Sequence, residues 1–555
     1  MSQIKDLINI IFPDVKITIQ NLEKKYPERR LPSGAEVTRF APSPTGFLHT
    51  GSLFTSLIAK TIARQNNGIF YTRLEDTDSK REISGSGDEL MKQLAVFGVS
   101  PDEGFLADNK ETGLYGPYVQ SKRADIYRIV IKHLMEIGRA YPCFCTTEEL
   151  ELIRKEQESY KQMPGYYGQY AKCRNLSVDE QIERIQRGEK FVIRFRSMGN
   201  HFSKIKVHDE IRGDIEIADN DLDIVILKSD GLPTYHFAHV VDDHFMRTTL
   251  VSRGEEWISS LPIHIELFEA LNWKAPKYAH LPVIMKLDNG NKRKLSKRKD
   301  PEAAVSYFIE NGYPPIAVIN YLMSIANSNY EEWTIQNRSY EYQKFHFDLQ
   351  NMSLDGALYD IDKLGYFSKG IISHFSAKEL TYFVKTWSSV YNRMLYSLIE
   401  HDERYFEKIM NIEREKENPR KDYAKYSDIY PLIRFFYVDY YEMIVENHPY
   451  NEHISKKIVS QVLESIITEN DYSLDEESWF ESLKKISLKN GFAVSNKDYK
   501  LNKDKFLGHV GDVAEILRIS LCASKNSPNL YQVMQIMGKF EVDKRLEYVI
   551  DNFLK

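Results

Sequence analysis

The sequence predicts an α/β fold with an open parallel sheet, followed by a long all-helical region. Two blocks of alternating strands and helices, at about 35–118 and 223–288, indicate the sheet. After about residue 360 the chain has helical patterns and no strand-like alternation. At 555 residues the chain is too long for a single core, so several domains are expected.

The first block is predicted to be a compact β-α-β unit. Residues 37–40 form a predicted strand, which ends in a turn rich in Pro and Gly at 41–46. A helix with one apolar face is expected from Ser52 to the Asn66-Asn67-Gly68 cap, and residues 69–74 form the next predicted strand. Because a helix connects the two strands, they are expected to lie parallel in one sheet.

The second block repeats this alternation later in the chain. Strands are predicted at 223–227, 249–253 and 278–285, with helices from Tyr235 and over 264–271 between them. The stretch between the two blocks has helices and mixed segments. This change of pattern indicates a domain inserted into the sheet.

Charged side chains occur at the points where the predicted strands end. Arg39 ends the first strand, Glu75 follows the second and Arg253 ends a later one, while His49 begins a helix. An almost continuous basic run at 292–299 follows the last strand. In open α/β sheets, ligands bind beyond the carboxyl ends of the strands, so these side chains are expected to converge.

This set of side chains suits a substrate with a carboxylate and an amine, next to a polyphosphate. The fork of an arginine matches a carboxylate, and a glutamate matches an ammonium group. A helix start with His49 and a nearby glycine lets phosphate approach backbone N–H groups, and mobile lysines follow charge that develops on phosphates. The sequence has neither a G-x-x-x-x-G-K-[ST] nor a G-x-G-x-x-G motif, so no P-loop or dinucleotide site is indicated.

Each of these features alone has a simpler interpretation. A basic run is usually a solvated loop, a histidine at a helix start is usually a polar cap, and acidic residues after a strand are usually surface charges. Their occurrence together, in this chain order, favours a catalytic site.

Longer motifs strengthen this interpretation. The chain carries, in order, Arg39-Phe40-Ala41-Pro42-Ser43-Pro44-Thr45-Gly46 with His49-Thr50-Gly51-Ser52, then Arg73-Leu74-Glu75-Asp76-Thr77-Asp78, and later Lys294-Leu295-Ser296-Lys297-Arg298. These motifs closely resemble the signatures of class I aminoacyl-tRNA synthetases, specifically the bacterial-type glutamyl-tRNA synthetases. The resemblance is strong over about 35–370. It implies a Rossmann-like class I catalytic domain with an inserted acceptor-binding domain, followed by an all-helical anticodon-binding region.

The resemblance also divides the chain into segments. The expected segments are an N-terminal helical extension at 1–34, the two halves of the catalytic domain at 35–118 and 223–288, the inserted acceptor-stem-binding domain at 119–222, a stem-contact domain with the basic loop at 289–370, and a helical anticodon-binding domain at 371–555.

Positions that match the family's motifs are the candidate site residues. The resemblance implies that the amino-acid substrate is bound by Arg39, Ala41, Ser43, Glu75, Tyr235, His239 and Arg253. It implies that ATP is bound by His49, Gly51, Glu256, Trp257 and Lys297, and that catalysis is assisted by His49, Gly51, Lys294 and Lys297. Arg39 with Tyr235 would hold the side-chain carboxylate of glutamate, and Glu75 would hold its α-ammonium.

The reaction implied by the resemblance joins glutamate to tRNA(Glu) in two steps. The α-carboxylate of glutamate attacks the α-phosphate of ATP, which carries Mg²⁺, and the terminal adenosine hydroxyl of the tRNA then takes the glutamyl group. No covalent enzyme intermediate is needed, so positioning and electrostatics carry the catalysis. Charging of tRNA(Gln) as well stays open, because anticodon contacts cannot be assigned from the sequence.

One position departs from the family pattern. His239 stands where the family often has Asn in the amino-acid pocket. A histidine there could still donate a hydrogen bond, but it would make the charge of the pocket depend on pH. Neutral variation is the simpler interpretation.

Three of the four cysteines have a spacing typical of a metal site. Cys143 and Cys145, with Cys173 further on, resemble the zinc site that some family members carry in the inserted domain. Three thiolates and one oxygen would make a tetrahedral structural Zn²⁺ site, and Tyr170 is the expected oxygen ligand, although its spacing is one residue short. The competing tyrosines are Tyr166 and Tyr167. Three reduced cysteines without metal are the alternative.

Composition excludes several other classes of protein. With 42% apolar and 28% charged residues, the chain is neither disordered nor fibrous, and no apolar run is long enough for a membrane span. We expect a reducing cytoplasmic compartment, since four cysteines do not make a disulfide framework. We also expect no signal peptide and a monomer. The net charge of −6 does not exclude tRNA, because binding follows local patches.

Two other functions fit the sequence less well. A non-catalytic tRNA-binding paralogue would have no reason to keep His49, Glu75, Arg253 and Lys297 together. A nucleotidyl-transfer enzyme with a small substrate would have little use for the long helical carboxyl-terminal half. The sequence therefore favours the ligase reaction.

Overall fold

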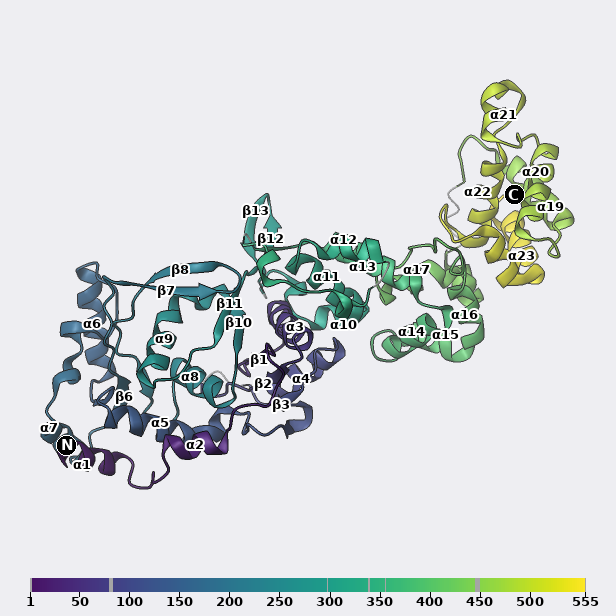
Figure 1. Ribbon diagram of the computed structural model, residues 1–555. Helices are drawn as coiled ribbons and strands as arrows, with labels where there is room; N and C mark the ends of the chain where they lie inside the picture. Colours follow the sequence, from purple (N-terminus) through teal and green to yellow (C-terminus); the bar gives the residue numbers. More distant parts are fainter. Residues whose placement is uncertain are drawn as a thin grey trace. The chain divides into compact units, whose positions relative to one another are not determined.

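The computed structural model describes residues 2–78, 83–296, 298–337, 340–354, 356–444 and 450–554 (Figure 1). The chain divides into two compact units, which are described separately. The first unit comprises Met1–Tyr307 and Val318–Asp360, and the second comprises Phe308–Ala317 and Ile361–Lys555. No helix in the described part of the chain is long and apolar enough to cross a membrane.

A parallel sheet forms the centre of the first unit, as the sequence predicts. It consists of two halves. One half has β1 (Val37–Phe40), β2 (Ile69–Thr72) and β3 (Glu103–Phe105), with the short β4 (Glu111–Thr112) antiparallel at its edge, and the other begins with β10 (Leu250–Gly254) and β11 (Lys277–Leu281). The two halves meet where the Thr249 N–H donates to the Val37 carbonyl oxygen at 3.0 Å. Strands far apart in the sequence, β1 and β10, therefore lie side by side.

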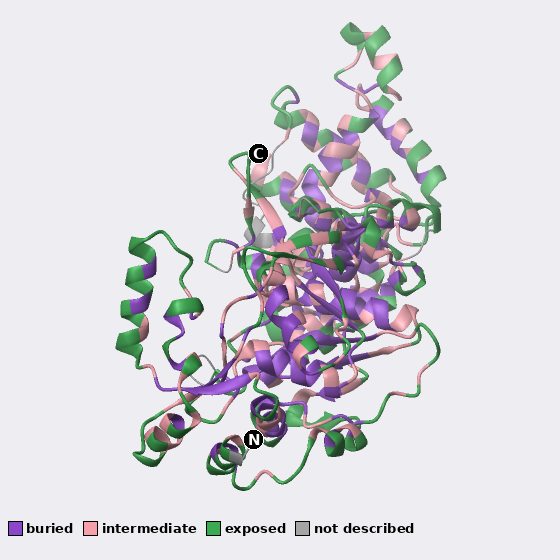
Figure 2. Ribbon diagram, turned by 60° about the vertical axis from the view of Figure 1, so that its left-hand side comes forward, coloured by how far each residue is buried: buried purple, intermediate pink, exposed green. Residues whose placement is uncertain are grey.

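Helices connect the strands and bury the sheet. All four residues of β1 are buried, and so are four of the five residues of β10, as expected for parallel strands covered on both faces. The connecting helices are α3 (Thr50–Gln65), α4 (Ser86–Val96), α8 (Tyr235–Phe245) and α9 (Leu261–Ala270). The crossover from β1 to β2 is made by α3, which contacts both strands. The buried residues of the molecule concentrate in such strands and inner helix faces (Figure 2).

A second, antiparallel sheet lies in the segment between the two blocks. The segment contains α5 (Ala124–Glu136), α6 (Thr147–Ser159), α7 (Val178–Gln186) and the strands β5 (Ala140–Cys143) and β6 (Val192–Phe195), and the sheet is completed by β9 (Val225–Leu227) from the start of the second block. The strand predicted at 223–227 is β9, so its expected place in the parallel sheet is corrected. A short apolar run does not reveal which strand it pairs with.

A hairpin extends the parallel sheet beyond β11. It consists of β7 (Lys204–Asp209) and β8 (Gly213–Ala218), and it joins the sheet where Asp209 pairs with Tyr278 of β11. Asp209 therefore comes from the inserted segment but lies at the edge of the parallel sheet.

The strand predicted at 278–285 is two strands in different sheets. β11 ends before Pro282, and β12 (Ile284–Asp288) pairs antiparallel with β13 (Asn291–Lys294) and parallel with β14 (Ala357–Tyr359). Asn289 and Gly290 have φ angles of 49° and 83°, the left-handed conformations that a tight two-residue hairpin requires. The basic run, expected as a loop, therefore begins as strand β13. The helices that follow are α10 (Ser306–Asn311), α11 (Pro315–Ala326) and α12 (Tyr330–Asn337).

The N-terminal extension, predicted to be helical, contains two helices. They are α1 (Ser2–Ile11), which packs on α5 and α7, and α2 (Ile19–Lys25). Beyond α2, Arg29 donates to both carboxylate oxygens of Glu103 at 3.0 Å, and the Tyr26 hydroxyl donates to the Gly116 carbonyl oxygen at 2.9 Å. The extension is thus attached to the first unit by specific contacts.

The second unit is helical, as predicted, and its described residues contain no β-strand. Its helices after Asp360 are α13 (Ile361–His374), α14 (Ala377–Tyr391), α15 (Arg393–His401), α16 (Glu403–Met410), α17 (Ile429–Ile433), α18 (Val438–Ile444), α19 (Lys456–Glu469), α20 (Glu476–Lys489), α21 (Asn496–Leu501), α22 (Val510–Cys522) and α23 (Leu530–Phe553). Their apolar faces share one extended core, which includes Leu380, Ile433, Val462 and Leu517. In α23 the helix is interrupted at Gly538, which has a φ of 76°.

Candidate active site

A cavity opens at the carboxyl ends of the parallel strands in the first unit. Its volume is about 1140 Å³, enough for a ligand of nucleotide size. The residues that line it, here called the cavity wall, include the expected Arg39, Ala41, Ser43, His49, Gly51, Glu75, Tyr235, Arg253, Glu256, Trp257 and Lys294. Lys297 lies outside the described residues. The fold therefore brings together expected side chains that are far apart in the sequence.

Arg39 ends β1 and presents a buried guanidinium to the cavity. Its contacts with Asp243 Oδ2, the Ser252 carbonyl oxygen and His239 Nδ1 are all long, at 3.4 Å. Burial lowers the pKa of Arg39, but the Asp243 carboxylate raises it and the net shift is upward, so the group stays charged. A charged guanidinium with only long protein contacts is suited to a carboxylate ligand.

Glu75 follows β2 and supplies a buried carboxyl group in the same wall. Its Oε1 accepts from Arg73 at 2.9 Å and from Gln120 Nε2 at 3.5 Å. Burial raises the pKa of Glu75, and the neighbouring Arg73 opposes that rise. The carboxyl group is fixed in place and can match an ammonium group of a ligand.

His49 caps the amino end of α3. Its Nδ1 accepts from the Gly51 N–H at 3.0 Å, so the neutral imidazole carries its proton on Nε2. A Cβ atom at Gly51 would lie 3.3 Å from His49 Nδ1, and a side chain there would therefore crowd this cap. The helix start adds the positive end of the helix dipole to the cavity wall, which favours phosphate.

Tyr235 and Trp257 form an aromatic part of the cavity wall. Tyr235 begins α8, Trp257 follows β10, and their ring centroids are 4.4 Å apart. Burial raises the pKa of Tyr235, so its hydroxyl stays protonated and can donate a hydrogen bond. Aromatic rings at this position can pack against a planar base.

The basic run approaches the cavity through Lys294, which ends β13 and is exposed. Asp300, which the sequence reasoning missed, organises this segment. It accepts from two nitrogens of Arg293 at 2.6 and 2.8 Å and from the Ser296 N–H at 2.9 Å. The hydrogen bonds from Arg293 hold the pKa of Asp300 below its usual range. A single aspartate after a basic run carries no sequence signal that separates it from surface charge.

His239, also expected in the amino-acid pocket, lies 3.4 Å from Arg39 but is not among the residues of the cavity wall. It is fully buried on α8, and its Nδ1 lies 3.1 Å from Asp243 Oδ2. Burial, together with Arg253 and Arg39, lowers the pKa of His239 well below its usual value. The imidazole therefore stays neutral. One helical turn after Tyr235, this position faces the protein interior.

A buried cluster of charges lies behind the cavity, and the sequence reasoning gave it no role. Arg73 is fully buried and contacts Asp243 at 2.7 Å, Glu75 at 2.9 Å and Asp242 at 3.6 Å. Asp242 also accepts from Arg123 Nε at 2.6 Å. The cluster connects the end of β2 to α8 and so fixes the carboxyl group of Glu75.

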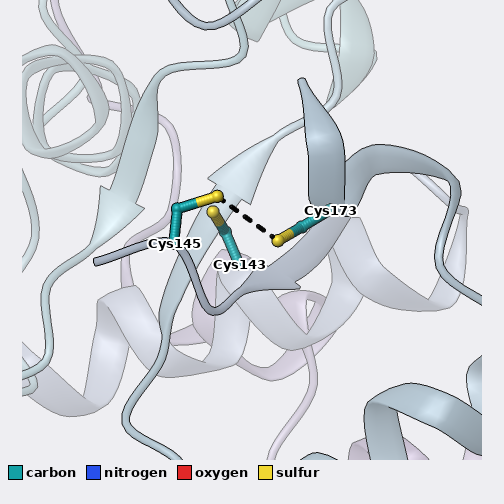
Figure 3. Close-up of side chains that lie close together, drawn as sticks. All are labelled: Cys143, Cys145 and Cys173. Carbon is teal, nitrogen blue, oxygen red and sulfur yellow. Dashed lines mark hydrogen bonds between the residues drawn. The ribbon is translucent and has the colours of Figure 1, made fainter. Parts of the chain in front are cut away.

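The three cysteines of the inserted segment converge (Figure 3). Their sulfur atoms all lie within 4.8 Å of one another, and Cys145 Sγ is 3.6 Å from Cys173 Sγ. The donor set fits a tetrahedral Zn²⁺ site, in which two sulfurs at 2.3 Å from the metal are about 3.8 Å apart.

The structure places Tyr166 beside these sulfurs instead of the expected Tyr170. The Tyr166 hydroxyl is 3.4 Å from Cys143 Sγ and 3.3 Å from Cys145 Sγ. The Tyr170 hydroxyl donates to Gln162 at 2.8 Å. The geometry therefore favours Tyr166, one of the competing tyrosines, over Tyr170 as the fourth ligand. The spacing of residues in the sequence did not identify the tyrosine nearest the sulfurs, because the chain from 160 to 175 is irregular.

Comparison with known proteins agrees with this architecture. Residues 36–364 match the family model for tRNA synthetases class I (E and Q), catalytic domain, and residues 505–550 match that of an anticodon binding domain. A glutamate–tRNA ligase of Acetivibrio thermocellus is 46% identical over 549 residues, which cover 98% of this chain and 100% of the relative. One of Clostridium perfringens (strain 13) is 45% identical over 543 residues, with 98% and 100% covered.

A solved structure is also similar. The crystal structure of a glutamate tRNA ligase from Elizabethkingia meningosepticum, in complex with its amino acid, has a TM-score of 0.75 and 29% identity, and covers 94% of this chain and 100% of that chain. With a parallel sheet, a cavity at its strand ends and a family match over more than half of its length, the chain belongs to the class I tRNA synthetases (E and Q).

Proposed function

We propose that this protein is a glutamate–tRNA ligase, which activates glutamate with ATP and transfers it to the 3′-terminal adenosine of tRNA(Glu). The observation that carries the proposal is one cavity wall with two arginines, a buried glutamate and a histidine-capped helix start. This set fits an amino acid with a second carboxylate, next to a nucleotide. Relatives that match almost the whole chain carry the same name.

The amino acid is bound by groups of opposite charge. Arg39, with the Tyr235 hydroxyl, binds the side-chain carboxylate, and Glu75 binds the α-ammonium. Arg253 faces the same substrate from the end of β10. Ala41 and Ser43 shape the pocket beside Arg39. Binding each polar group of glutamate by a fixed partner of opposite charge orients the α-carboxylate for reaction.

ATP is bound at the start of α3. His49 and Gly51 contact the phosphates, while Glu256 and Trp257 flank the adenosine. Mg²⁺ that arrives with ATP offsets the charge of the phosphates. When the glutamate α-carboxylate attacks the α-phosphorus, the bond to pyrophosphate breaks, and Lys294 stabilises the charge that collects on this leaving group. In the second step, the adenosine hydroxyl of the tRNA displaces AMP.

Replacing Lys294 by alanine is expected to lower kcat about 10²- to 10³-fold and to change the KM for glutamate little. The ammonium group acts where charge develops, not where glutamate binds. Steady-state tRNA charging measures both constants. Lys292→Ala is the matched control, because Lys292 is exposed on the same strand and does not belong to the cavity wall. Equal losses in the two variants would contradict the role of Lys294.

The other segments are proposed to bind tRNA. We assign 119–222 to the acceptor stem, 289–370 to the stem contact and 371–555 to the anticodon. The family match at 505–550 supports the last assignment. We propose a monomer that works in the cytoplasm, where the four free cysteines stay reduced. A tRNA range that also includes tRNA(Gln) is the alternative.

Amino-acid-dependent exchange of pyrophosphate into ATP, with tRNA(Glu) present, tests the first step of the reaction. We expect exchange with glutamate and none with glutamine or aspartate. A protein that binds tRNA but exchanges pyrophosphate with no amino acid would be a non-catalytic tRNA-binding paralogue.

We also propose that Cys143, Cys145 and Cys173 bind a structural Zn²⁺, with the Tyr166 hydroxyl oxygen as the fourth ligand. Support comes from the mutual distances of the sulfurs and from the hydroxyl, which lies within 3.4 Å of two of them. Such a site would hold β5 to the irregular segment that carries Tyr166 and Cys173.

Metal analysis of protein purified under reducing conditions is expected to find one Zn²⁺ per chain. Cys173→Ser is expected to lose the metal, and Tyr166→Phe to release it faster to a chelator. Tyr170→Phe is the matched control and is expected to behave like the unmodified protein. Equal release from both tyrosine variants would rule out Tyr166 as a ligand, and protein without bound zinc would rule out the site.

A further inference from the structure

Arg253 differs from Arg39 in the groups that hold it. Its Nε–H donates to His280 Nε2 at 3.0 Å, and its NH1 lies 3.2 Å from His264 Nδ1. The guanidinium also lies over the ring of Tyr278, 4.8 Å from the ring centroid. Arg39 has a salt bridge with Asp243, whereas no salt bridge of Arg253 occurs among the described residues. Its NH2 also donates to the Trp257 carbonyl oxygen at 3.4 Å, so Arg253 is held by two imidazoles and a carbonyl oxygen and not by a carboxylate.

Asp209 determines where His280 carries its proton. Asp209 is fully buried at the end of β7, and its Oδ2 lies 2.7 Å from His280 Nδ1. A carboxylate only accepts and a guanidinium only donates, so the imidazole between them has its proton on Nδ1 and a lone pair on Nε2. Burial lowers the pKa of His280, which agrees with a neutral ring. Asp209 is itself fixed, since Oδ1 accepts the N–H groups of Ile211 and Arg212 at 3.0 Å.

Arg253 also determines which ring nitrogen of His264 carries the proton. Because Arg253 only donates, His264 Nδ1 is the acceptor, and the proton of the neutral ring is on Nε2, 3.0 Å from His236 Nδ1. Burial lowers the pKa of His264 and brings the pKa of His236 to about 4. Two neutral imidazoles thus present lone pairs to the same guanidinium.

We propose that His280, oriented by Asp209, and His264 are positioning residues, which hold the Arg253 guanidinium toward glutamate and leave its charge for the substrate. The proposal rests on the proposed function, in which Arg253 faces bound glutamate. A carboxylate at either position would also hold the arginine, but it would offset the charge that the substrate needs. Neutral acceptors provide orientation without that loss.

The main variants remove or retain the acceptor on His280. His280→Leu removes it, and His280→Gln keeps an oxygen acceptor near the position of Nε2. In steady-state charging of tRNA(Glu), His280→Leu is expected to raise the KM for glutamate about 10- to 100-fold, with the KM for ATP unchanged. His280→Gln is expected to recover most of the glutamate affinity. A merely structural role would lower the active fraction without this split between the two KM values.

A second variant tests the proton placement. In Asp209→Asn, the amide NH₂ is expected on the side of His280, because that side faces one backbone N–H, that of His280, whereas the other side faces two, those of Ile211 and Arg212. The ring of His280 then accepts at Nδ1 and carries its proton on Nε2, where it opposes the Arg253 N–H. We expect a rise in the KM for glutamate similar to that of His280→Leu, with a side chain of unchanged size.

His244→Leu is the matched control for loss of an imidazole in the same unit. His244 is half-buried, lies 2.7 Å from the Glu23 carboxylate and does not contact Arg253 in the described structure. The control is expected to leave the KM for glutamate unchanged. Unchanged glutamate KM in both His280→Leu and Asp209→Asn, or no recovery in His280→Gln, would overturn the proposal. Absence of glutamate-dependent charging by the unmodified protein would instead overturn the proposed function.

Discussion

Replacing Arg39 by leucine is expected to lower kcat/KM for glutamate about 10²- to 10³-fold, because truncation leaves the substrate carboxylate buried without its partner. The fold is expected to survive, since Asp243 keeps its contact with Arg73 at 2.7 Å. The KM for ATP should stay close to that of the unmodified protein, because Arg39 serves the amino-acid side of the cavity in the proposed function. Steady-state charging with glutamate and ATP varied in turn measures both effects.

The same variant should also lose selectivity. With a charged guanidinium replaced by an apolar side chain, the ratio of kcat/KM for glutamate to that for glutamine is expected to fall. Arg39→Lys keeps the charge but not the two parallel hydrogen bonds that a guanidinium can donate. Its selectivity should therefore lie between that of the unmodified protein and that of Arg39→Leu. An Arg39→Leu protein with unchanged selectivity and unchanged kcat/KM would show that another group recognises the side-chain carboxylate.

Replacing Arg73 by leucine is expected to lower the free energy of unfolding of the first unit by about 3–5 kcal/mol. Arg73 is fully buried, and its removal leaves Glu75, Asp242 and Asp243 close together with less positive charge among them. Urea unfolding followed by hydrogen exchange of the β1 and β2 amides measures the effect in this unit. The helices of the second unit should keep their protection.

Arg154→Leu is the matched control for this loss. Arg154 forms an ion pair with Glu158 at 2.9 Å, the same distance as between Arg73 and Glu75, but both partners are exposed. Solvent screens such a pair, so its removal is expected to change the free energy of unfolding little. Similar losses in the two variants would show that burial does not determine the contribution of the Arg73 cluster.

The positions where the strands end could be predicted, because each strand is a short apolar run bounded by turn residues. Parallel connections then place Arg39, Glu75 and Arg253 at one edge without further information. Which strands pair with each other was less predictable. The run at 223–227 joins an antiparallel sheet as β9, and the run at 278–285 is divided at Pro282, because local pattern does not report the partner of a strand.

The candidate site was predicted where a residue acts through its position in a motif, and missed where it acts through a distant partner. Arg73 and Asp243 are 170 residues apart in the chain, and only the fold shows that they are paired. His239 lies one helical turn from Tyr235 but is buried behind the cavity wall. Tyr166 reaches the cysteines through an irregular segment, for which sequence spacing gives no geometry.

Charging of tRNA transcripts with labelled amino acids tests the central claim most directly. Purified protein, ATP and Mg²⁺ are combined with transcripts of tRNA(Glu) or tRNA(Gln) and with labelled glutamate or glutamine. We predict glutamate on tRNA(Glu) and no attachment of glutamine. Glutamate on both tRNAs would agree with the proposed reaction and show that the protein also charges tRNA(Gln). Glutamate on neither tRNA, while both still bind, would contradict the account.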